Sequence, residues 1–162
     1  MKTILMSLAS LFLATAALAT PAVGDYAKYN VTISQGNQKM SLIAEQTITA
    51  FDQAANQYTV QTTYNYNGQS QIDSAQKPAD EFVSDAMAKD IIANCASYQG
   101  TLEQVTVPAG KFNSCKLPTS DGNGGTGSIN LVAGVAFGIV KGTSTEQGKV
   151  TNVELLAFTN GK

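Results

Sequence analysis

Apolar and polar residues alternate along most of the chain, which is the pattern of half-buried β-strands. One alternation runs from Tyr26 to Ile33, and a second runs from Met40 to Ile48. The segment Ser34-Gln35-Gly36-Asn37 lies between them and is rich in turn residues, so we expect a β-hairpin. The clearest strand runs from Tyr58 to Tyr66, where polar residues separate the apolar ones, and we expect one face to meet the core and the other to meet water.

The apolar period changes between Lys77 and Asn94. Phe82, Val83, Ala86, Met87, Ile91 and Ile92 recur there at the three- and four-residue spacings of an amphipathic helix. Pro78 is suited to a first helical position, so we predict a helix from Pro78 to Asn94. Its acidic face is expected to be solvated.

The remaining segments also favour extended structure. Leu102 to Val107 and Phe112 to Leu117 flank a Pro108-Ala109-Gly110 turn and predict a second hairpin. Ile129 to Val140 is almost wholly apolar, which predicts one strand that is covered on both faces, with Gly134 and Gly138 permitting a bulge. A turn-rich stretch from Gly142 to Gly148 precedes a last strand from Val150 to Phe158.

The first residues have the features of a secretory signal peptide. Lys2 precedes an apolar run from Ile4 to Leu18, and Ala17-Leu18-Ala19 supplies the small residues that signal peptidase requires. The run is shorter than the ~20 residues that span a bilayer. We therefore expect residues 1–19 to be removed, residues 20–162 to form a single β-rich domain, and the protein to be periplasmic or secreted.

Composition argues against most catalytic chemistry. The 162-residue chain has no His, so a Ser or Cys nucleophile lacks its usual base, and we expect no enzyme activity. The candidate carboxylates, Asp80, Glu81, Asp85 and Asp90, lie mostly on the exposed face of the predicted helix. The formal net charge is −2 and no basic cluster is present, which excludes nucleic acid as a partner.

The two cysteines, Cys95 and Cys115, are expected to form a disulfide because their number is even and the chain is exported. A redox role would more naturally use closely spaced cysteines such as C-x-x-C. A metal site would need further ligands, and zinc is excluded in a chain without His. We predict no metal and no cofactor.

The second half of the chain carries a family resemblance. Glu103-Gln104-Val105-Thr106-Val107-Pro108-Ala109-Gly110-Lys111-Phe112 and the later Gly138-Ile139-Val140-Lys141 resemble an E-x-V-x-V-P-A-G-x-F hairpin and a G-[IVL]-V-K strand. These motifs are typical of small exported bacterial envelope proteins of unassigned function, which look like distant relatives of the Lol-type lipoprotein carriers. The resemblance implies a mainly β (α+β) fold, a curved antiparallel sheet or open half-barrel with one main helix packed against it. It carries over no catalytic residue.

A curved sheet of this kind suggests a binding function. Its inner face would present an apolar lining suited to an acyl chain or another apolar ligand. The predicted ligand-binding residues are Tyr58, Tyr64, Tyr66, Leu131, Phe137 and Ile139. Two alternatives stay open: the tyrosines pack across strands, or the helix fills the concavity with Phe82, Met87 and Ile91.

The second functional hypothesis is a non-enzymatic structural or protein-interaction module of the cell envelope. Exposed Gln, Asn and Thr residues between Gln57 and Asn67 would then form a sheet face or edge for an envelope protein partner. The sequence does not discriminate well between the two. We favour the apolar-ligand hypothesis because the resemblance and the Ile129 to Val140 segment point to it together.

Overall fold

The computed structural model describes residues 22–82, 84–120, 122 and 124–159. The elements of this part are β1 (Tyr26–Gln35), β2 (Gln38–Asp52), β3 (Gln57–Tyr66), β4 (Gln69–Pro78), the 3-10 helix η1 (Ala79–Glu81), α2 (Asp85–Ala93), the 3-10 helix η2 (Cys95–Tyr98), β5 (Thr101–Val107), β6 (Gly110–Ser120), β7 (Thr126–Leu131), β8 (Ile139–Glu146) and β9 (Lys149–Thr159). The mainly β fold expected from the sequence is confirmed. The predicted signal peptide lies outside the described residues.

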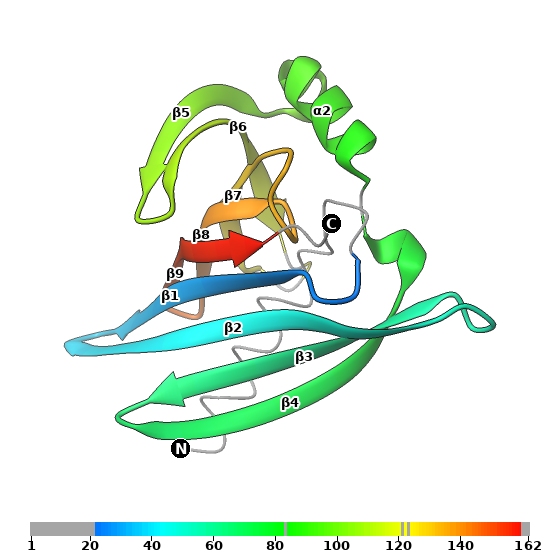
Figure 1. Ribbon diagram of the computed structural model, residues 1–162. Coiled ribbons are helices and arrows are strands. Elements are labelled where there is room, and N and C mark those ends of the chain that lie inside the picture. Colours follow the sequence, from blue (N-terminus) through cyan, green and yellow to red (C-terminus); the bar gives the residue numbers. More distant parts are fainter. Residues whose placement is uncertain (1–21, 83, 121, 123, 160–162) are drawn as a thin grey trace.

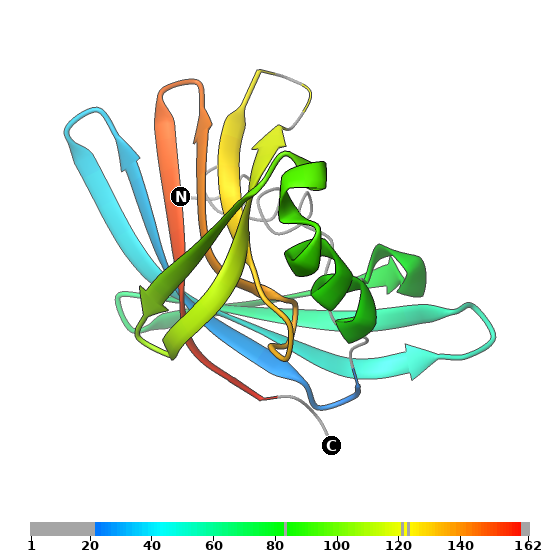
Figure 2. The ribbon, with the colours of Figure 1, turned by 90° about the horizontal axis from the view of Figure 1, so that it is seen from above.

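The nine strands of the described part form one open antiparallel sheet with the order β4-β3-β2-β1-β9-β8-β7-β6-β5. Figures 1 and 2 show that this sheet is strongly curved, with β2, β3 and β4 on one side of the interior and β5 and β6 on the other. The helix α2 lies beside the β5–β6 end. The predicted half-barrel with one main helix is therefore present.

The core lies on the concave face because the strand registers align the apolar residues there. Tyr29 pairs with Ala44, which pairs in turn with Tyr64, so these three side chains share one face of β1, β2 and β3. All three are buried. Their alternation with half-exposed residues is the pattern predicted from the sequence for β1 and β3.

The sequence analysis did not predict the edge strand β4. This strand extends to Pro78, where the sequence analysis placed the start of a helix. Asn67 and Gly68 both have positive φ, 49° and 76°, as the central residues of a type I′ hairpin turn require. The strand that follows is the end of the sheet, and nearly all of its side chains are exposed. It buries neither face, so it has no apolar alternation by which the sequence could reveal it.

The helix is correspondingly shorter than predicted. Pro78 has extended backbone angles, and α2 begins only after Ser84, whose side-chain oxygen accepts a hydrogen bond from the Met87 N–H at 3.2 Å. This is an ordinary N-cap. Ala88 is fully buried and packs with Leu131 in a second, smaller apolar cluster.

The apolar segment from Ile129 to Val140 is two strands and a loop, where the sequence predicted one strand. β7 ends at Leu131 and β8 begins at Ile139. The chain turns between them through positive φ at Gly134, Phe137 and Gly138. The loop at 132–138 is apolar because it packs into the main core, with Val132, Val135 and Ala136 almost fully buried. The predicted turn from Gly142 to Gly148 is mostly strand β8, and only its end is a turn.

The predicted hairpin around Pro108 is confirmed as β5 and β6. Val105 and Val107 belong to the main core. At the tip, the Ala109 N–H donates a hydrogen bond to the Leu155 carbonyl of β9 at 3.1 Å. β8 pairs with β9 only as far as Glu154. The hairpin tip thus contacts β9 just beyond the last β8 pairing and draws the end of the sheet towards its middle.

Candidate functional site

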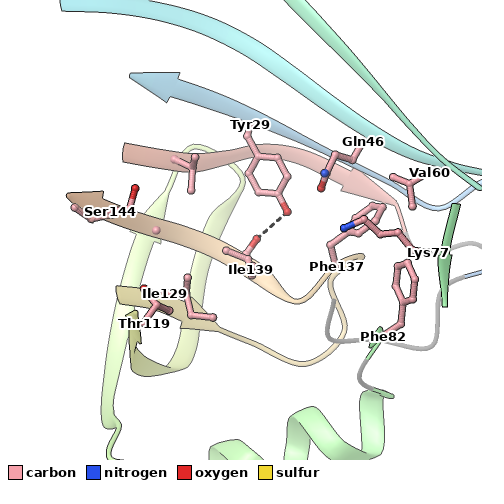
Figure 3. A pocket seen from close by; sticks show the side chains of 13 residues that line it. Tyr29, Gln46, Val60, Lys77, Phe82, Thr119, Ile129, Phe137, Ile139 and Ser144 are labelled. Atoms are coloured by element: carbon pink, nitrogen blue, oxygen red, sulfur yellow. Dashed lines mark hydrogen bonds between the residues drawn. The ribbon is translucent and has the colours of Figure 1, made fainter. Parts of the chain in front are cut away.

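A cavity opens on the concave face of the sheet (Figure 3). Most of its lining comes from strands, and two phenylalanines complete it from segments outside the sheet. The lining residues are Tyr29, Gln46, Val60, Lys77, Phe82, Thr119, Ile129, Phe137, Ile139, Gly142, Thr143, Ser144 and Val153. The cavity volume is about 50 Å³. Since one water molecule needs about 10–15 Å³ by this measure, the cavity accommodates a few waters and is smaller than an acyl chain.

Two buried polar side chains face this space from β1 and β2. The Tyr29 hydroxyl donates a hydrogen bond to the Ile139 carbonyl at 3.2 Å, which links β1 to the start of β8 across the sheet. Burial raises the pKa of Tyr29 well above its usual value, so the hydroxyl stays neutral. Gln46 is only 7% exposed and adds an amide group to the lining.

One side chain of the lining carries a charge. Lys77 lies near the end of β4, opposite Tyr58, and is half-buried. Figure 3 shows its side chain extending from β4 into the cavity towards Phe137. Burial lowers the pKa of the Lys77 ammonium from its usual value, and the negative charge of Glu81 offsets part of that effect.

Phe82 and Phe137 close the cavity on the side away from the sheet. Phe82 follows η1 and contacts Tyr58 edge to face, with ring centroids 5.0 Å apart. Phe137 belongs to the loop at 132–138 and is 7% exposed. Both rings belong to the main core cluster.

The loop that carries Phe137 is held to the helix by one carboxylate. Asp85, the first residue of α2, accepts a hydrogen bond from the Gly134 N–H at 2.9 Å and forms an ion pair with Lys89 at 2.6 Å. The contact with Lys89 and the Gly134 hydrogen bond lower the pKa of Asp85, although partial desolvation opposes them. Asp85 therefore stays ionised and links α2 to the cavity cover at neutral pH.

The structure brings together only part of the predicted binding set. Phe137 and Ile139 line the cavity, whereas the other four residues are not in its lining. Tyr58 lies between Phe51 and Phe82, in a tilted contact with the first ring and an edge-to-face contact with the second. Tyr64 and Tyr66 pack in or against the main core, and Leu131 packs in the second cluster. The alternative that the tyrosines pack across strands describes their contacts better.

The other alternative, in which the helix fills the concavity, holds for one of its three residues. Phe82 lines the cavity, but it precedes α2. Met87 is 53% exposed, and Ile91 packs against the second cluster. The short helix therefore packs on residues of β6 and β7, near the β5 end of the sheet, and does not line the cavity.

The sequence analysis missed Lys77 as a lining residue, although a signal in the sequence specifies its position. Asn67-Gly68 is a strong two-residue hairpin signal. A two-residue turn fixes the strand register, and that register pairs Tyr58 with Lys77 and Val60 with Ala75. Following the turn would have put Lys77 on the core-facing side of the tyrosine strand.

Cys95 and Cys115 form the predicted disulfide, which joins η2 to β6. Within the part of the chain that the structure describes, no group of three or more His, Cys, Asp or Glu side chains is placed to hold a metal ion. No helix among residues 22–82, 84–120, 122 and 124–159 is long and apolar enough to cross a membrane.

Comparison with known proteins identifies a fold and no family. No protein-family model and no curated protein matches the chain. The structure is similar to that of a Bacteroides fragilis protein that has a YmcC-like fold and whose export is inferred. The TM-score is 0.52 and the sequence identity is 11%. The match covers 90% of this chain and 100% of the other. At this identity the similarity shows a common fold alone.

Proposed function

We propose that this chain is an exported envelope protein that binds an apolar, lipid-like ligand on the concave face of its sheet, without catalysing a reaction. The observation that carries the proposal is the cavity, in which Val60, Phe82, Phe137, Ile139 and other apolar residues surround a few polar groups. Apolar walls with a small number of directed polar groups are typical of sites for small lipophilic ligands.

Export is supported by the signal-peptide pattern of residues 1–19 and by the disulfide, since disulfides persist in oxidising compartments. The similarity of the sequence motifs to relatives of Lol-type carriers supports a lipid-related role. The absence of His from the chain supports binding over catalysis.

A ligand larger than a few waters requires the cover of the cavity to move. Phe82 and Phe137 are the side chains placed to do so, because they line the cavity from outside the strands. Rotation of these rings would join the cavity to the space that they now fill. Binding by this route displaces ring–core contacts, so the ligand must replace the apolar contacts that the rings lose.

The test is binding of a neutral fluorescent probe, N-phenylnaphthylamine, to the delipidated exported protein. We expect saturable binding to the wild type. Ser144→Phe introduces a ring on the cavity side of β8 and should abolish binding, while Thr145→Phe introduces the same ring at the next, exposed position and should leave binding intact. Lack of saturable binding by the folded wild type, or equal binding by both variants, would contradict the proposal.

The second candidate is a protein-interaction module, favoured by the two ends of the open sheet. β3, where the sequence suggested an edge, is paired on both sides, so the polar edge of the described sheet is β4. An extended segment of an envelope protein would add to this edge. Recovery of one specific envelope protein with the wild type, and its loss when Ser74→Pro interrupts β4, would favour this function.

A further inference from the structure

Gln46 is the polar member of an otherwise apolar row on the concave face of β2. Every second residue of this strand from Leu42 to Ile48 is buried, and Ala44 is the fourth member of the row. Gln46 is 7% exposed, and Figure 3 shows its amide group pointing from β2 into the cavity. Such a position ordinarily takes an apolar residue, because burying an amide costs free energy unless the amide is hydrogen-bonded.

The neighbours of Gln46 do not supply that hydrogen bond. Within the described residues, none of the side-chain hydrogen bonds involves the Gln46 amide. Its partners in register are Ala27, which has no polar side-chain atom, and Thr62, whose hydroxyl is hydrogen-bonded to Tyr64. The Tyr29 hydroxyl donates its proton to a backbone carbonyl. The fold therefore leaves the donors and the acceptor of this amide to a molecule that enters the cavity.

The chemistry of a primary amide specifies what such a molecule carries. The NH₂ group donates two hydrogen bonds, and the carbonyl oxygen accepts hydrogen bonds. A hydrocarbon pairs with neither group, and an ester or an ether pairs only with the NH₂ group because it has no donor. An amide or an alcohol has both a donor and an acceptor, so it can bond both parts of the Gln46 side chain. A site with a buried polar group discriminates against analogues that leave this group unpaired.

We propose that the ligand is a chain amphiphile whose head both donates and accepts hydrogen bonds, an amide or an alcohol, and that Gln46 binds this head. This inference rests on the proposed binding function and specifies the chemical class of its ligand. The apolar chain lies against Phe82, Phe137 and Ile139, which line the same cavity. Gln46 is then a specificity-determining residue that occupies a core position for binding and not for the stability of the ligand-free protein.

The experiment measures displacement of N-phenylnaphthylamine by dodecanamide, dodecanol and 1-chlorododecane, which share one chain and differ in the head. Gln46→Met keeps an unbranched side chain of similar length and removes the amide. We expect it to weaken binding of the preferred head about tenfold, because one or two hydrogen bonds are lost, and to leave 1-chlorododecane unaffected. Gln38→Met, at an exposed position of the same strand, is the matched control and should bind all three compounds as the wild type does.

Urea unfolding of the ligand-free variants tests whether the amide is unpaired in the fold. Because it bonds to none of the described side chains, at least one of Gln46→Met and Gln46→Leu should keep or raise the urea midpoint of the wild type. Lower midpoints in both variants would show that the amide stabilises the ligand-free protein and would overturn the inference.

The binding outcomes separate this inference from the proposed function. If the folded wild type binds neither the probe nor any of the three compounds, both proposals fail. If Gln46→Met binds the probe but loses no affinity for dodecanamide or dodecanol, the role of Gln46 is refuted and apolar binding stands. Loss for dodecanamide alone identifies an amide ligand, loss for dodecanol alone identifies an alcohol, and equal loss for both supports the shared chemistry.

Discussion

Phe137 combines an unfavourable backbone conformation with a buried ring. Its φ is 63°, in the left-handed region that costs a residue with a Cβ roughly 1–2 kcal/mol. The ring is 7% exposed and lines the cavity. Burial of the ring must outweigh the backbone cost. Packing therefore holds the side chain that covers the cavity in place although the backbone is strained. Such residues are concentrated at binding sites.

This balance predicts that Phe137→Gly is more stable than Phe137→Ala, the reverse of the usual order of the two substitutions. Phe137→Ala should lower the free energy of unfolding by about 3–5 kcal/mol because the ring contacts are lost. Phe137→Gly should lower it by about 1 kcal/mol less, since Gly adopts positive φ freely. Urea unfolding measures both. Phe82 has a φ of −101° and serves as the control, where the Gly variant should be the less stable one. A Phe137→Gly protein less stable than Phe137→Ala would disprove the strain argument.

At this scale the sequence identifies types of residue better than their contacts. Phe137 and Ile139, two of the predicted ligand-binding residues, line the cavity on the concave face. Tyr58 and Tyr64 were placed on the correct face, but the structure does not put them in the cavity lining. Tyr58 contacts Phe51, its partner across β2 and β3, and Phe82, which follows β4 in the chain. Cross-strand alternation defines a face, whereas the position of a cavity on that face depends on what covers it.

At the scale of elements, the disulfide fixes the end of the helical segment on β6, and Gly100 makes the approach possible. A Cβ at Gly100 would lie 2.5 Å from the Cys115 Sγ, 2.7 Å from the Cys95 Sγ and 2.9 Å from the Leu117 Cδ2. Each distance is below ordinary van der Waals contact. The glycine, which lies between η2 and β5 in the chain, is therefore required by the space that the two sulfurs occupy.

Gly100→Ala is expected to destabilise the oxidised protein by roughly 1–3 kcal/mol through overpacking. In a Cys95→Ala, Cys115→Ala background the sulfurs are absent, so the same substitution should cost less. That background itself should be less stable than the wild type by about 3 kcal/mol, since it loses the constraint of a 20-residue separation. Urea unfolding of the four proteins gives the coupling energy. An equal cost of Gly100→Ala in both backgrounds would exclude the sulfurs as its cause.

The elements that the sequence did not reveal share one physical cause. β4 is a strand without an apolar face because it ends the sheet. The loop at 132–138 is a loop without polar residues because it fills the core. Strands usually carry an apolar face and loops are usually polar. In both of these segments, the position in the fold reverses that relation. The hairpin β5–β6 followed the usual relation, and its bounds were predicted closely.

At the scale of the molecule, the half-barrel is completed by contacts between distant segments. At the tip of the β5–β6 hairpin, the Ala109 N–H donates a hydrogen bond to the Leu155 carbonyl of β9. Phe112 packs edge to face on Phe158, with ring centroids 6.1 Å apart. Tyr29 bonds to Ile139 across the interior. The resemblance to half-barrel proteins predicted the curvature. The cavity depends on these long-range contacts and on the cover, neither of which has a local sequence signal.

Burial of tyrosine inside the half-barrel makes the stability of the whole molecule sensitive to alkali. The chain lacks His, the side chain that ordinarily titrates between about pH 5 and 8. Burial raises the pKa of Tyr29 above its unfolded value of 10.0, and burial with the charge of Asp73 raises that of Tyr64. Above pH 10.0 the unfolded state therefore loses protons that the folded state retains, so stability falls as pH rises. The lowered pKa of Lys77 acts in the opposite direction, but the shift of Tyr29 is the larger one.

We therefore expect the free energy of unfolding to decline above about pH 10, by at most about 1.4 kcal/mol per pH unit for each buried tyrosine. Tyr29→Phe removes the titrating hydroxyl and keeps the ring. At neutral pH it should cost about 1 kcal/mol for the lost hydrogen bond to Ile139, and its alkaline decline should be shallower than that of the wild type. Urea unfolding over a pH series measures both effects, with Tyr98→Phe, at an exposed ring, as the control. Parallel alkaline declines in Tyr29→Phe and the wild type would show that the buried hydroxyl in the cavity wall does not govern the loss of the fold.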